Sequence, residues 1–325
     1  MMDTQEFGER LVTNLEKVIV GKREALELIV IGLLCEGHIL IEDVPGVGKT
    51  MLARSLARSL ACTYNRIQFT PDMLPSDITG VSIYNQQKGK FEFRQGPIVG
   101  QIILADEINR ATPKTQAALL EAMEERQVTV DGTTHVLPRP FMVLATQNPI
   151  EYEGTFPLPE AQLDRFLLRV RLGYPDFVDE MKIIEDQRLK HPIETLESVA
   201  KAGEVLDAAK GIREVHLSAA AKRYITDLSR RTRQSNDIYL GASPRGTLFL
   251  ARAGQARAAF GGRSYVLPDD VKDVAVPVLA HRIIVSPGAR LRELSAERIV
   301  QEIVRNTPVP GGDFGLATAQ EAQAA

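Results

Sequence analysis

The chain has 325 residues, which is enough for about two domains, one of them with a large core. Its 44 % hydrophobic and 25 % charged residues are ordinary values for a globular protein. The net charge of −3, the 6 % of aromatic residues and the lack of tryptophan argue against a nucleic-acid partner, because phosphate neutralisation and base stacking need the opposite.

The sequence carries no signal for export or membrane insertion. Its first residues lack the basic region and apolar core of a signal peptide. The longest apolar segment, residues 28–35, is too short to span a bilayer. We therefore expect a cytoplasmic protein with no membrane span.

Five apolar, strand-like runs in the first half of the chain alternate with longer amphipathic segments. This order predicts an α/β fold in which a mostly parallel sheet has helices on both faces. We place this first domain at residues 1–172. The runs lie at 38–42, 65–69, 102–106, 141–146 and 167–172.

Two pairs of shorter alternating runs interrupt this pattern and predict two inserted β-hairpins. The first pairs residues 81–84 with 91–94. The second pairs residues 127–130 with 134–137 around an Asp131-Gly132 turn.

The first strand runs directly into a glycine-rich turn that ends Gly48-Lys49-Thr50. Gly46 and Gly48 have no β-carbon, so the backbone N–H groups of the turn can point inward around a phosphate. We expect Lys49 to place its charge on the β and γ phosphates and the hydroxyl of Thr50 to coordinate Mg²⁺. A helix over residues 50–60 follows. The predicted ATP-binding residues of the turn are Val44, Pro45, Gly46, Val47, Gly48, Lys49, Thr50 and Met51.

This turn departs from the G-x-x-x-x-G-K-[ST] pattern at its first position, where Asp43 replaces glycine. The alternative interpretation is a glycine-capped turn that simply joins a strand to a helix. The apolar strand before the turn and the apolar-periodic helix after it favour the phosphate cradle.

The third strand ends in two acids, Asp106 and Glu107. We predict that Asp106 holds Mg²⁺ through water and that Glu107 polarises the water that attacks the γ phosphate. The alternative is a strand that leaves the sheet through a solvated acidic turn.

Two further polar residues follow the next strands. Asn148 emerges after the fourth strand and is predicted to hold the attacking water with Glu107, although it is also a residue type that caps a turn before proline. Arg165 lies between apolar residues before the fifth strand and needs a partner. That partner is either an acid of the same chain, such as Asp164, or a phosphate bound to an adjacent subunit.

The segment 173–176, Gly-Tyr-Pro-Asp, breaks the α/β pattern, and the sequence beyond it is helical almost throughout. We predict an all-α second domain over 173–306 and a tail over 307–325 that lacks apolar periodicity and is expected to be disordered. The predicted helices lie at about 176–190, 195–209, 218–234, 244–259, 268–281 and 296–305.

Ser243 and Pro244 open one of these helices, and Arg245 follows them. A cation at a helix start opposes the helix dipole. A γ phosphate contacted across a domain cleft would explain its position.

In this order, the motifs resemble the MoxR family of AAA+ ATPases over about residues 4–305. Residues 42–50 resemble the Walker A motif of the family, which tolerates Asp at the first glycine position. Residues 106–111 resemble its Walker B motif. The resemblance implies that the fold is an AAA+ domain followed by a helical lid, and that the hairpins are the helix-2 insert and the pre-sensor-1 insertion.

The same resemblance assigns roles to residues outside these two motifs. It implies that Asn148 is sensor 1 and Arg245 is the sensor 2 arginine. It also implies that Val20 and Gly21 contact adenine, within the segment Val18-Ile19-Val20-Gly21. Arg165 resembles the arginine finger, for which Arg110 and Arg169 are the other candidates.

The resemblance also implies that several chains assemble into a ring, usually a hexamer. Such a ring would use ATP and Mg²⁺ in the chaperone-like maturation or activation of client proteins. A von Willebrand factor A domain protein is an implied partner. Three other functions remain open at this point: an ATPase subunit like that of magnesium chelatase, a nucleic-acid remodeller, and a small-molecule P-loop kinase.

Overall fold

The computed structural model describes residues 3–149 and 154–311. Packing divides the chain into two compact units. One, called here the α/β unit, comprises residues 7–207. The other, called the helical unit, comprises residues 208–311 together with 3–6. The part of the predicted tail at 312–325 lies outside the described residues.

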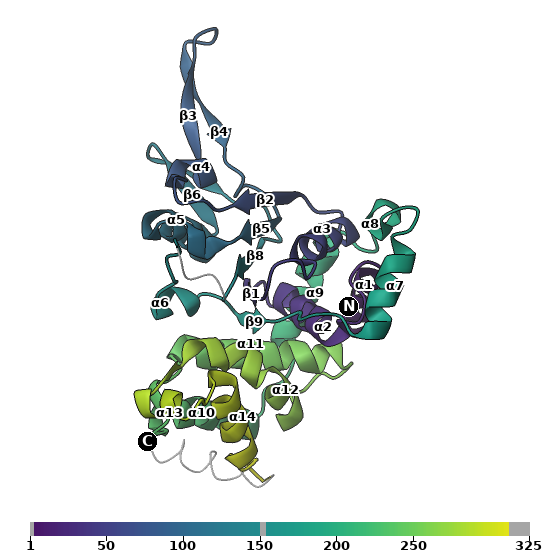
Figure 1. The fold of residues 1–325 in the computed structure, drawn as a ribbon, viewed down its shortest axis with the longest axis vertical. Helices are drawn as coiled ribbons and strands as arrows, with labels where there is room; N and C mark the ends of the chain where they lie inside the picture. Colours follow the sequence, from purple (N-terminus) through teal and green to yellow (C-terminus); the bar gives the residue numbers. More distant parts are fainter. Residues whose placement is uncertain (1–2, 150–153, 312–325) are drawn as a thin grey trace. The chain divides into compact units, whose positions relative to one another are not determined.

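A parallel five-stranded sheet in the order β2-β5-β8-β1-β9 forms the centre of the α/β unit (Figure 1). Each strand lies where the apolar runs predict one, to within a few residues. The parallel α/β architecture expected from the sequence is therefore confirmed. The strands are β1 (Ile39–Glu42), β2 (Tyr64–Gln68), β5 (Ile102–Asp106), β8 (Met142–Gln147) and β9 (Leu168–Val170).

Side chains from both faces of this sheet are buried, as a parallel sheet between helices requires. Alternate residues such as Leu40, Ile103 and Val143 join one apolar cluster with Leu119 of α5. On the opposite face, α2 packs so closely that a β-carbon on Gly32 would lie 2.6 Å from the Cδ1 atom of Ile39. The helices of the unit are α1 (Thr4–Glu16) from its fourth residue on, α2 (Arg23–Leu34), α3 (Lys49–Ser59), α4 (Pro75–Thr79), α5 (Pro113–Glu125), α6 (Glu160–Leu163), α7 (Phe177–Asp186), α8 (Pro192–Thr195) and the start of α9 (Ala202–Glu214).

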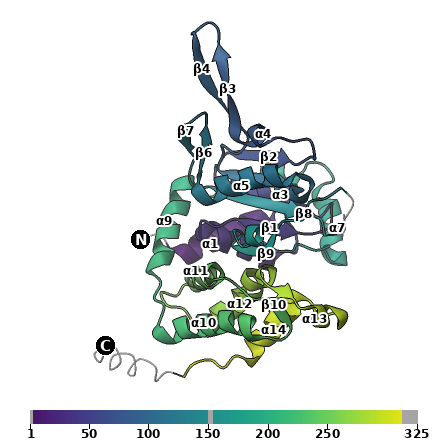
Figure 2. The same ribbon diagram turned by 90° about the vertical axis from the view of Figure 1, so that its left-hand side faces the viewer.

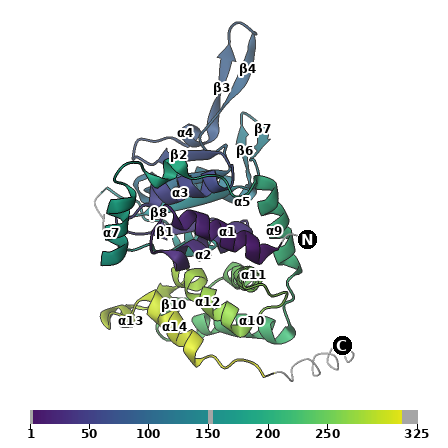
Figure 3. The same ribbon diagram turned by 90° about the vertical axis from the view of Figure 1, so that its right-hand side faces the viewer.

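Both predicted hairpins are present and extend from the same side of the sheet (Figures 2 and 3). The longer one joins β3 (Gly80–Asn85) to β4 (Lys90–Gln95), and the shorter one joins β6 (Gln127–Val130) to β7 (Thr133–Val136). The two touch through Phe93 and His135, whose rings stack with centroids 3.9 Å apart.

The segment 173–207 differs from its predicted organisation in two ways. It packs within the α/β unit, so the units divide at 207/208, whereas the sequence places the domain boundary at 172/173. The helix predicted at 195–209 is also wrong in its position, because helix α9 starts only at Ala202. Residues 196–201 are not helical because the amides of Val199 and Ala200 donate instead to the carbonyl of Ser59, at 2.9 and 3.1 Å.

The helical unit packs several amphipathic helices around buried residues such as Tyr224, Leu250 and Val274. It also contains a short antiparallel ribbon of β10 (Ile238–Leu240) and β11 (Ile284–Val285), which the helical periodicity did not reveal. Its longer helices are α10 (Ala219–Gln234), α11 (Pro244–Phe260), α12 (Pro268–Leu279) and α14 (Ala296–Asn306), with α13 (Pro287–Leu291) between the last two. In the part of the chain that the structure describes, no helix is long and apolar enough to cross a membrane.

Candidate active site

The strand register brings the polar strand ends to one edge of the sheet. Gln68 at the end of β2 pairs with Asp106 at the end of β5, and Ala105 pairs with Ala145 on β8, so Thr146 follows beside Asp106. On the other side of β8, Thr146 pairs with Ile41, just before the glycine-rich turn. The carboxyl edge of a parallel sheet is where open α/β folds bind their ligands.

The turn after β1 adopts a conformation that its glycines permit. Gly46 and Gly48 have φ angles of 86° and 88°, in the left-handed region that is strained for other residues. Gly48 is the N-cap of α3, and no heavy atom lies within 4 Å of a β-carbon built on Gly46. The result is a loop with open space along its backbone at the positive end of a helix, as anion binding requires.

Asp43 accounts for the departure from the glycine pattern. Its carboxylate is buried and accepts hydrogen bonds from the amides of Leu172 (2.6 Å), Gly173 (2.7 Å) and Val44 (2.9 Å). The side chain therefore ties the start of the turn to the chain just after β9. A glycine at this position would not make that connection.

Lys49 and the two acids line the same cavity, of about 190 Å³. The ammonium group of Lys49 donates to the carbonyl of Asp43 at 2.7 Å, which holds the side chain along the turn. Asn148 is buried and also lines this cavity. Among the residues that the structure describes, its lining is Pro45, Gly46, Gly48, Lys49, Thr50, Met51, Asp106, Glu107 and Asn148, all of which belong to the predicted site.

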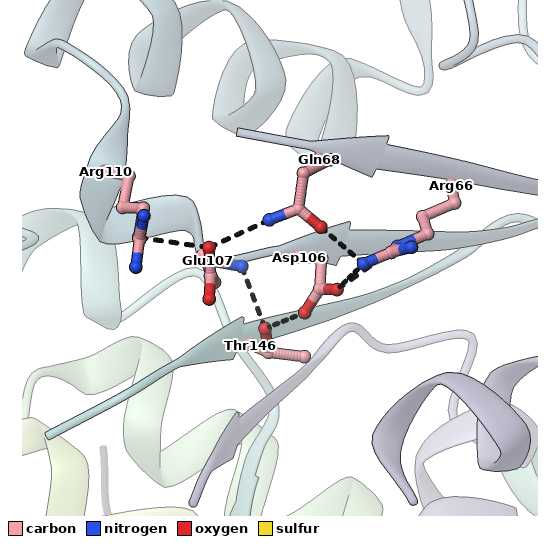
Figure 4. Close-up of polar contacts among 6 residues, drawn as sticks. All are labelled: Arg66, Gln68, Asp106, Glu107, Arg110 and Thr146. Carbon is pink, nitrogen blue, oxygen red and sulfur yellow. Dashed lines mark hydrogen bonds and ion pairs between the residues drawn. The ribbon is translucent and has the colours of Figure 1, made fainter. Parts of the chain in front are cut away.

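Asp106 is held on both of its carboxylate oxygens (Figure 4). The hydroxyl of Thr146 donates to Oδ1 at 2.6 Å. The guanidinium of Arg66, on β2, donates to Oδ2 from Nη2 at 2.6 Å and from Nε at 3.2 Å. The carboxylate is therefore fixed in orientation and balanced by a positive charge.

Glu107 is held by a second set of contacts that Figure 4 shows beside the first. Its Oε2 atom accepts from the amide of Gln68 at 2.8 Å and lies 3.0 Å from Nε of Arg110. The backbone of Glu107 is left-handed, with φ of 58°, and its N–H donates to the Thr146 hydroxyl at 2.9 Å. Strained non-glycine residues of this kind cluster at functional sites.

The residues around this cavity fit a magnesium–nucleotide complex. Mg²⁺ prefers oxygen ligands and usually takes only one or two from a protein, the rest coming from phosphates and water. The Thr50 hydroxyl and the Asp106 carboxylate supply such oxygens. Among residues 3–149 and 154–311, no cluster of three or more His, Cys, Asp or Glu side chains forms a metal cage of its own.

The segment predicted to contact adenine lies against the turn. The Cδ1 atom of Ile19 is 3.8 Å from a β-carbon built on Gly48. Val20 is largely buried, and Gly21 has a left-handed φ of 71°. The carboxylate of Asp179, on α7, occupies the space where Gly21 lacks a side chain. The structure thus brings Ile19 to the phosphate turn, and the contact of Val20 and Gly21 with a base stays a prediction.

All three candidates for the arginine finger have an acidic partner in the same chain. Arg165 pairs with Glu124 at 3.2 Å, not with Asp164, and its side chain is 30 % exposed. Arg169 pairs with Glu42 and is only 15 % exposed, whereas Arg110, paired with Glu107, is 42 % exposed. Exposure therefore disfavours Arg169, because a finger must reach a neighbouring subunit.

Arg245 belongs to the helical unit. Ser243 caps α11 by accepting a hydrogen bond from the amide of Gly246 at 3.3 Å, and Pro244 occupies the first turn. The helix start predicted from the sequence is confirmed. The role of Arg245 toward a nucleotide remains a prediction.

Three site residues were missed by the sequence analysis: Arg66, Gln68 and Thr146. Arg66 and Gln68 are two residues apart on β2, so both face the same way, and this alternation was a usable signal. The missing information was that β2 lies beside β5. Thr146 ends an otherwise apolar run, so the pattern indicates only that it belongs to the strand.

Comparison with known proteins agrees with this geometry. Residues 38–168 match the ATPase family associated with various cellular activities (AAA), and residues 230–303 match the AAA lid domain. Chaperone MoxR1 of Mycobacterium tuberculosis is 40 % identical, over 93 % of this chain and 82 % of its own length. The chain belongs to the MoxR family of AAA+ ATPases. The expected α/β fold with a helical lid is confirmed with it.

Other relatives cover nearly the whole chain. The protein YeaC of Bacillus subtilis is 52 % identical over 93 % of this chain and 94 % of its own length. Protein MoxR of Paracoccus denitrificans is 32 % identical over 91 % and 94 %. A crystal structure from Cytophaga hutchinsonii superposes with a TM-score of 0.88 at 39 % identity, covering 95 % of this chain and 97 % of that one.

Proposed function

We propose that this MoxR protein binds Mg²⁺ and ATP at the carboxyl edge of its sheet, hydrolyses ATP to ADP and phosphate, and uses that energy to remodel client proteins. The observation that carries the proposal is one cavity that joins the phosphate turn to Asp106, Glu107 and Asn148. Bound Mg²⁺ would supply charge stabilisation at the phosphates.

The residues of the chain would divide the remaining work. Lys49 and the amides of the turn bind and orient the phosphates, and Thr50 and Asp106 would hold the metal. Glu107 is placed to take a proton from the attacking water, which Asn148 would help to position. Gln68 and Arg110 both contact Oε2 of Glu107, and the other oxygen, Oε1, would face that water.

For client contact, the β3–β4 hairpin is the natural candidate. It extends away from the sheet and carries Tyr84 and Phe91 as a T-shaped pair with ring centroids 5.3 Å apart. Their exposed fractions are 52 % and 72 %. Exposed aromatic pairs of this kind are typical of protein contacts.

We further propose a homo-oligomeric ring, a hexamer as is usual in this family, in which Arg165 completes the site of the neighbouring subunit. Arg245 would contact the γ phosphate from the lid. A cytoplasmic location and a von Willebrand factor A domain partner belong to the same proposal. The name of one relative, chaperone MoxR1, supports the chaperone role.

The first test is Mg²⁺-dependent ATP hydrolysis by the purified chain, with Lys49→Ala as the variant. Lys49→Ala should weaken nucleotide binding about a hundredfold or more, because it removes a charge-assisted contact to the phosphates. Lys114→Ala, which changes an exposed lysine of α5, is the matched control and should bind ATP normally. Normal binding by Lys49→Ala would refute the site.

The second test concerns the trans role of Arg165. Arg165→Ala and Lys49→Ala proteins, each inactive, should partly restore hydrolysis when co-assembled, since some interfaces then combine an intact cradle with an intact finger. A finger contributes on the order of a thousandfold in rate. No recovery in mixtures that demonstrably co-assemble would leave Arg165 as the partner of Glu124 only.

The third test addresses the client. A Glu107→Gln protein should retain ATP and accumulate bound client proteins. The same protein with Tyr84→Ser and Phe91→Ser should lose them while still binding ATP. Equal capture by both would place client contact elsewhere.

A further inference from the structure

Arg66 lies at a position where it affects a predicted magnesium ligand. It belongs to β2, which is an edge strand, and it approaches Asp106 from the side of the sheet edge (Figure 4). Two of its nitrogens contact Oδ2, at 2.6 and 3.2 Å. The side chain of Asp106 is only 12 % exposed, so Arg66 supplies the positive charge that this largely buried carboxylate needs.

The acceptor capacity of Asp106 is almost used up by these contacts. A carboxylate has about four lone-pair sites. Thr146 occupies one on Oδ1, and Arg66 directs two donors at Oδ2. A magnesium-bound water would have to use the one remaining site, on Oδ1 beside the Thr146 contact, or replace a donor. The guanidinium charge would also repel the metal across the same carboxylate.

Arg66 is also the contact that is easiest to displace. Its side chain is 46 % exposed, whereas Thr146 is buried. Partly exposed ion pairs contribute little net stability and a long arginine side chain can move into solvent. The arriving metal would therefore remove Arg66 and leave the Thr146 hydrogen bond in place.

The same guanidinium also links Asp106 to Glu107. Arg66 donates to Oε1 of Gln68, which orients the Gln68 amide so that its nitrogen donates to Glu107. The two acids are thus connected through Arg66. A change at the metal ligand can reach the residue that polarises water.

We propose that Arg66 and Mg²⁺ compete for Asp106, so that Arg66 is the cation of the metal-free site and sets how much Mg²⁺ strengthens nucleotide binding. This inference rests on the proposed ATPase function. It adds to that function a residue that lowers magnesium affinity and assigns Arg66 no contact with the nucleotide.

The test measures the dissociation constant of the β,γ-imido analogue of ATP by calorimetry, once in EDTA and once in saturating Mg²⁺. Arg66→Met should tighten binding in Mg²⁺ about tenfold, because the competing charge is gone, and should leave binding in EDTA within about twofold. Arg66→Lys keeps the charge and should lie close to wild type. Thermal unfolding of each variant checks that it is folded, and Arg66→Gln serves if Arg66→Met is not.

A matched control separates the effect of Arg66 from a general loss of a partly exposed arginine. Arg23→Met removes an arginine of similar exposure, 43 %, that also pairs with carboxylates but lies on α2. It should leave both constants unchanged.

Each outcome decides the matter. Weaker binding of Arg66→Met in Mg²⁺ would mean that Arg66 positions Asp106 for the metal, and unchanged binding would mean that it is only structural; both overturn the inference. If Arg66→Met changes the ratio of the dissociation constants in EDTA and in Mg²⁺ only because binding in EDTA becomes weaker, Arg66 contacts phosphate. That result also overturns the inference. If the wild-type chain does not bind the analogue at all, the proposed ATPase function fails instead.

Discussion

Polar networks lie at both ends of the strands of the central sheet, at the edge formed by their amino ends (the amino edge) and at the edge formed by their carboxyl ends (the carboxyl edge). At the amino edge, His38 accepts a hydrogen bond from the amide of Val143 at 3.0 Å and contacts the carbonyl of Met123 at 3.0 Å. Neither contact involves a cavity-lining residue. At the carboxyl edge, Asp106 and Glu107 are also hydrogen-bonded, but both line a cavity.

The second network of the amino edge is ionic. Glu36 is only 5 % exposed and contacts Arg126 at 3.0 Å and Arg139. Its partners come from the end of α5 and from the segment before β8, so it joins three parts of the chain. From this comparison we infer a rule for this fold. A network whose hydrogen bonds and ion pairs are all made by protein groups stabilises the folded chain, whereas a network that lines a cavity acts on a ligand.

The largest effect that this rule predicts is that of Glu107→Gln on turnover. Turnover should fall about 10² to 10⁴-fold, because the amide cannot accept the proton of the attacking water. The free energy of unfolding should change by less than about 0.5 kcal/mol, since the side chain is partly exposed. Single-turnover hydrolysis and urea unfolding give the two values, with Glu121→Gln on α5 as control. A large loss of stability would contradict the rule.

The second prediction concerns His38 and pH. Burial lowers the pKa of His38 to about 4 from its ordinary value of 6.5. The unfolded chain therefore takes up a proton below pH 6.5 that the folded chain does not. Stability that is fully present above pH 6.5 should be lost as the pH falls toward 4, by about 3 kcal/mol in total.

Urea unfolding between pH 7 and pH 4.5 measures this loss. His38→Leu should be less stable at pH 7, because the Val143 amide loses its acceptor, but its stability should fall less steeply over this range. An identical slope in the variant would assign the titration to another group.

Some residues of these networks can be placed from local sequence patterns, and others only once the order of the strands in the sheet is known. Asp106 and Glu107 stand at the end of one strand and Lys49 follows the turn after another, and parallel strands bring their carboxyl ends to one edge whatever their neighbours are. The contacts of Arg66 and Gln68 depend on β2 lying beside β5, which no local pattern specifies. Helix α9 was misplaced for a similar reason, since the carbonyl of Ser59 is distant in sequence.

The third prediction returns to Glu36. Burial raises the pKa of its carboxyl group, but hydrogen bonds and charges from Arg139 and Arg126 outweigh burial, and the net pKa is lowered. Glu36→Gln should therefore reduce the free energy of unfolding at pH 7 by about 2 kcal/mol, a value discounted for the partial exposure of both arginines. ATP affinity should not change.

Two observations check this reading of Glu36. The stability that its charge provides should be present above the ordinary pKa of 4.5 and disappear as the pH falls through the lowered value, so wild type and Glu36→Gln should converge in acid. Glu185→Gln, at an exposed ion pair with Arg188, should cost less than about 0.5 kcal/mol. A comparable loss in both variants would mean that the buried network has no special role.

The smallest effect is expected for a change of Asp43. This residue tests the rule because it has features of both kinds of network. It stands in the phosphate turn, yet its carboxylate is completed by three backbone amides, and Lys49 contacts its carbonyl rather than its side chain. The rule therefore assigns the side chain to stability. Asp43→Asn can keep its oxygen on Leu172 and Gly173 and lose only the Val44 contact, so it should cost about 1 kcal/mol and leave ATP affinity within about threefold. A loss of ATP affinity of tenfold or more with an unchanged free energy of unfolding would show that the contact of Asp43 with the chain after β9 shapes the phosphate turn itself. The position of a residue at the carboxyl edge would then predict its role better than whether protein groups satisfy its hydrogen bonds.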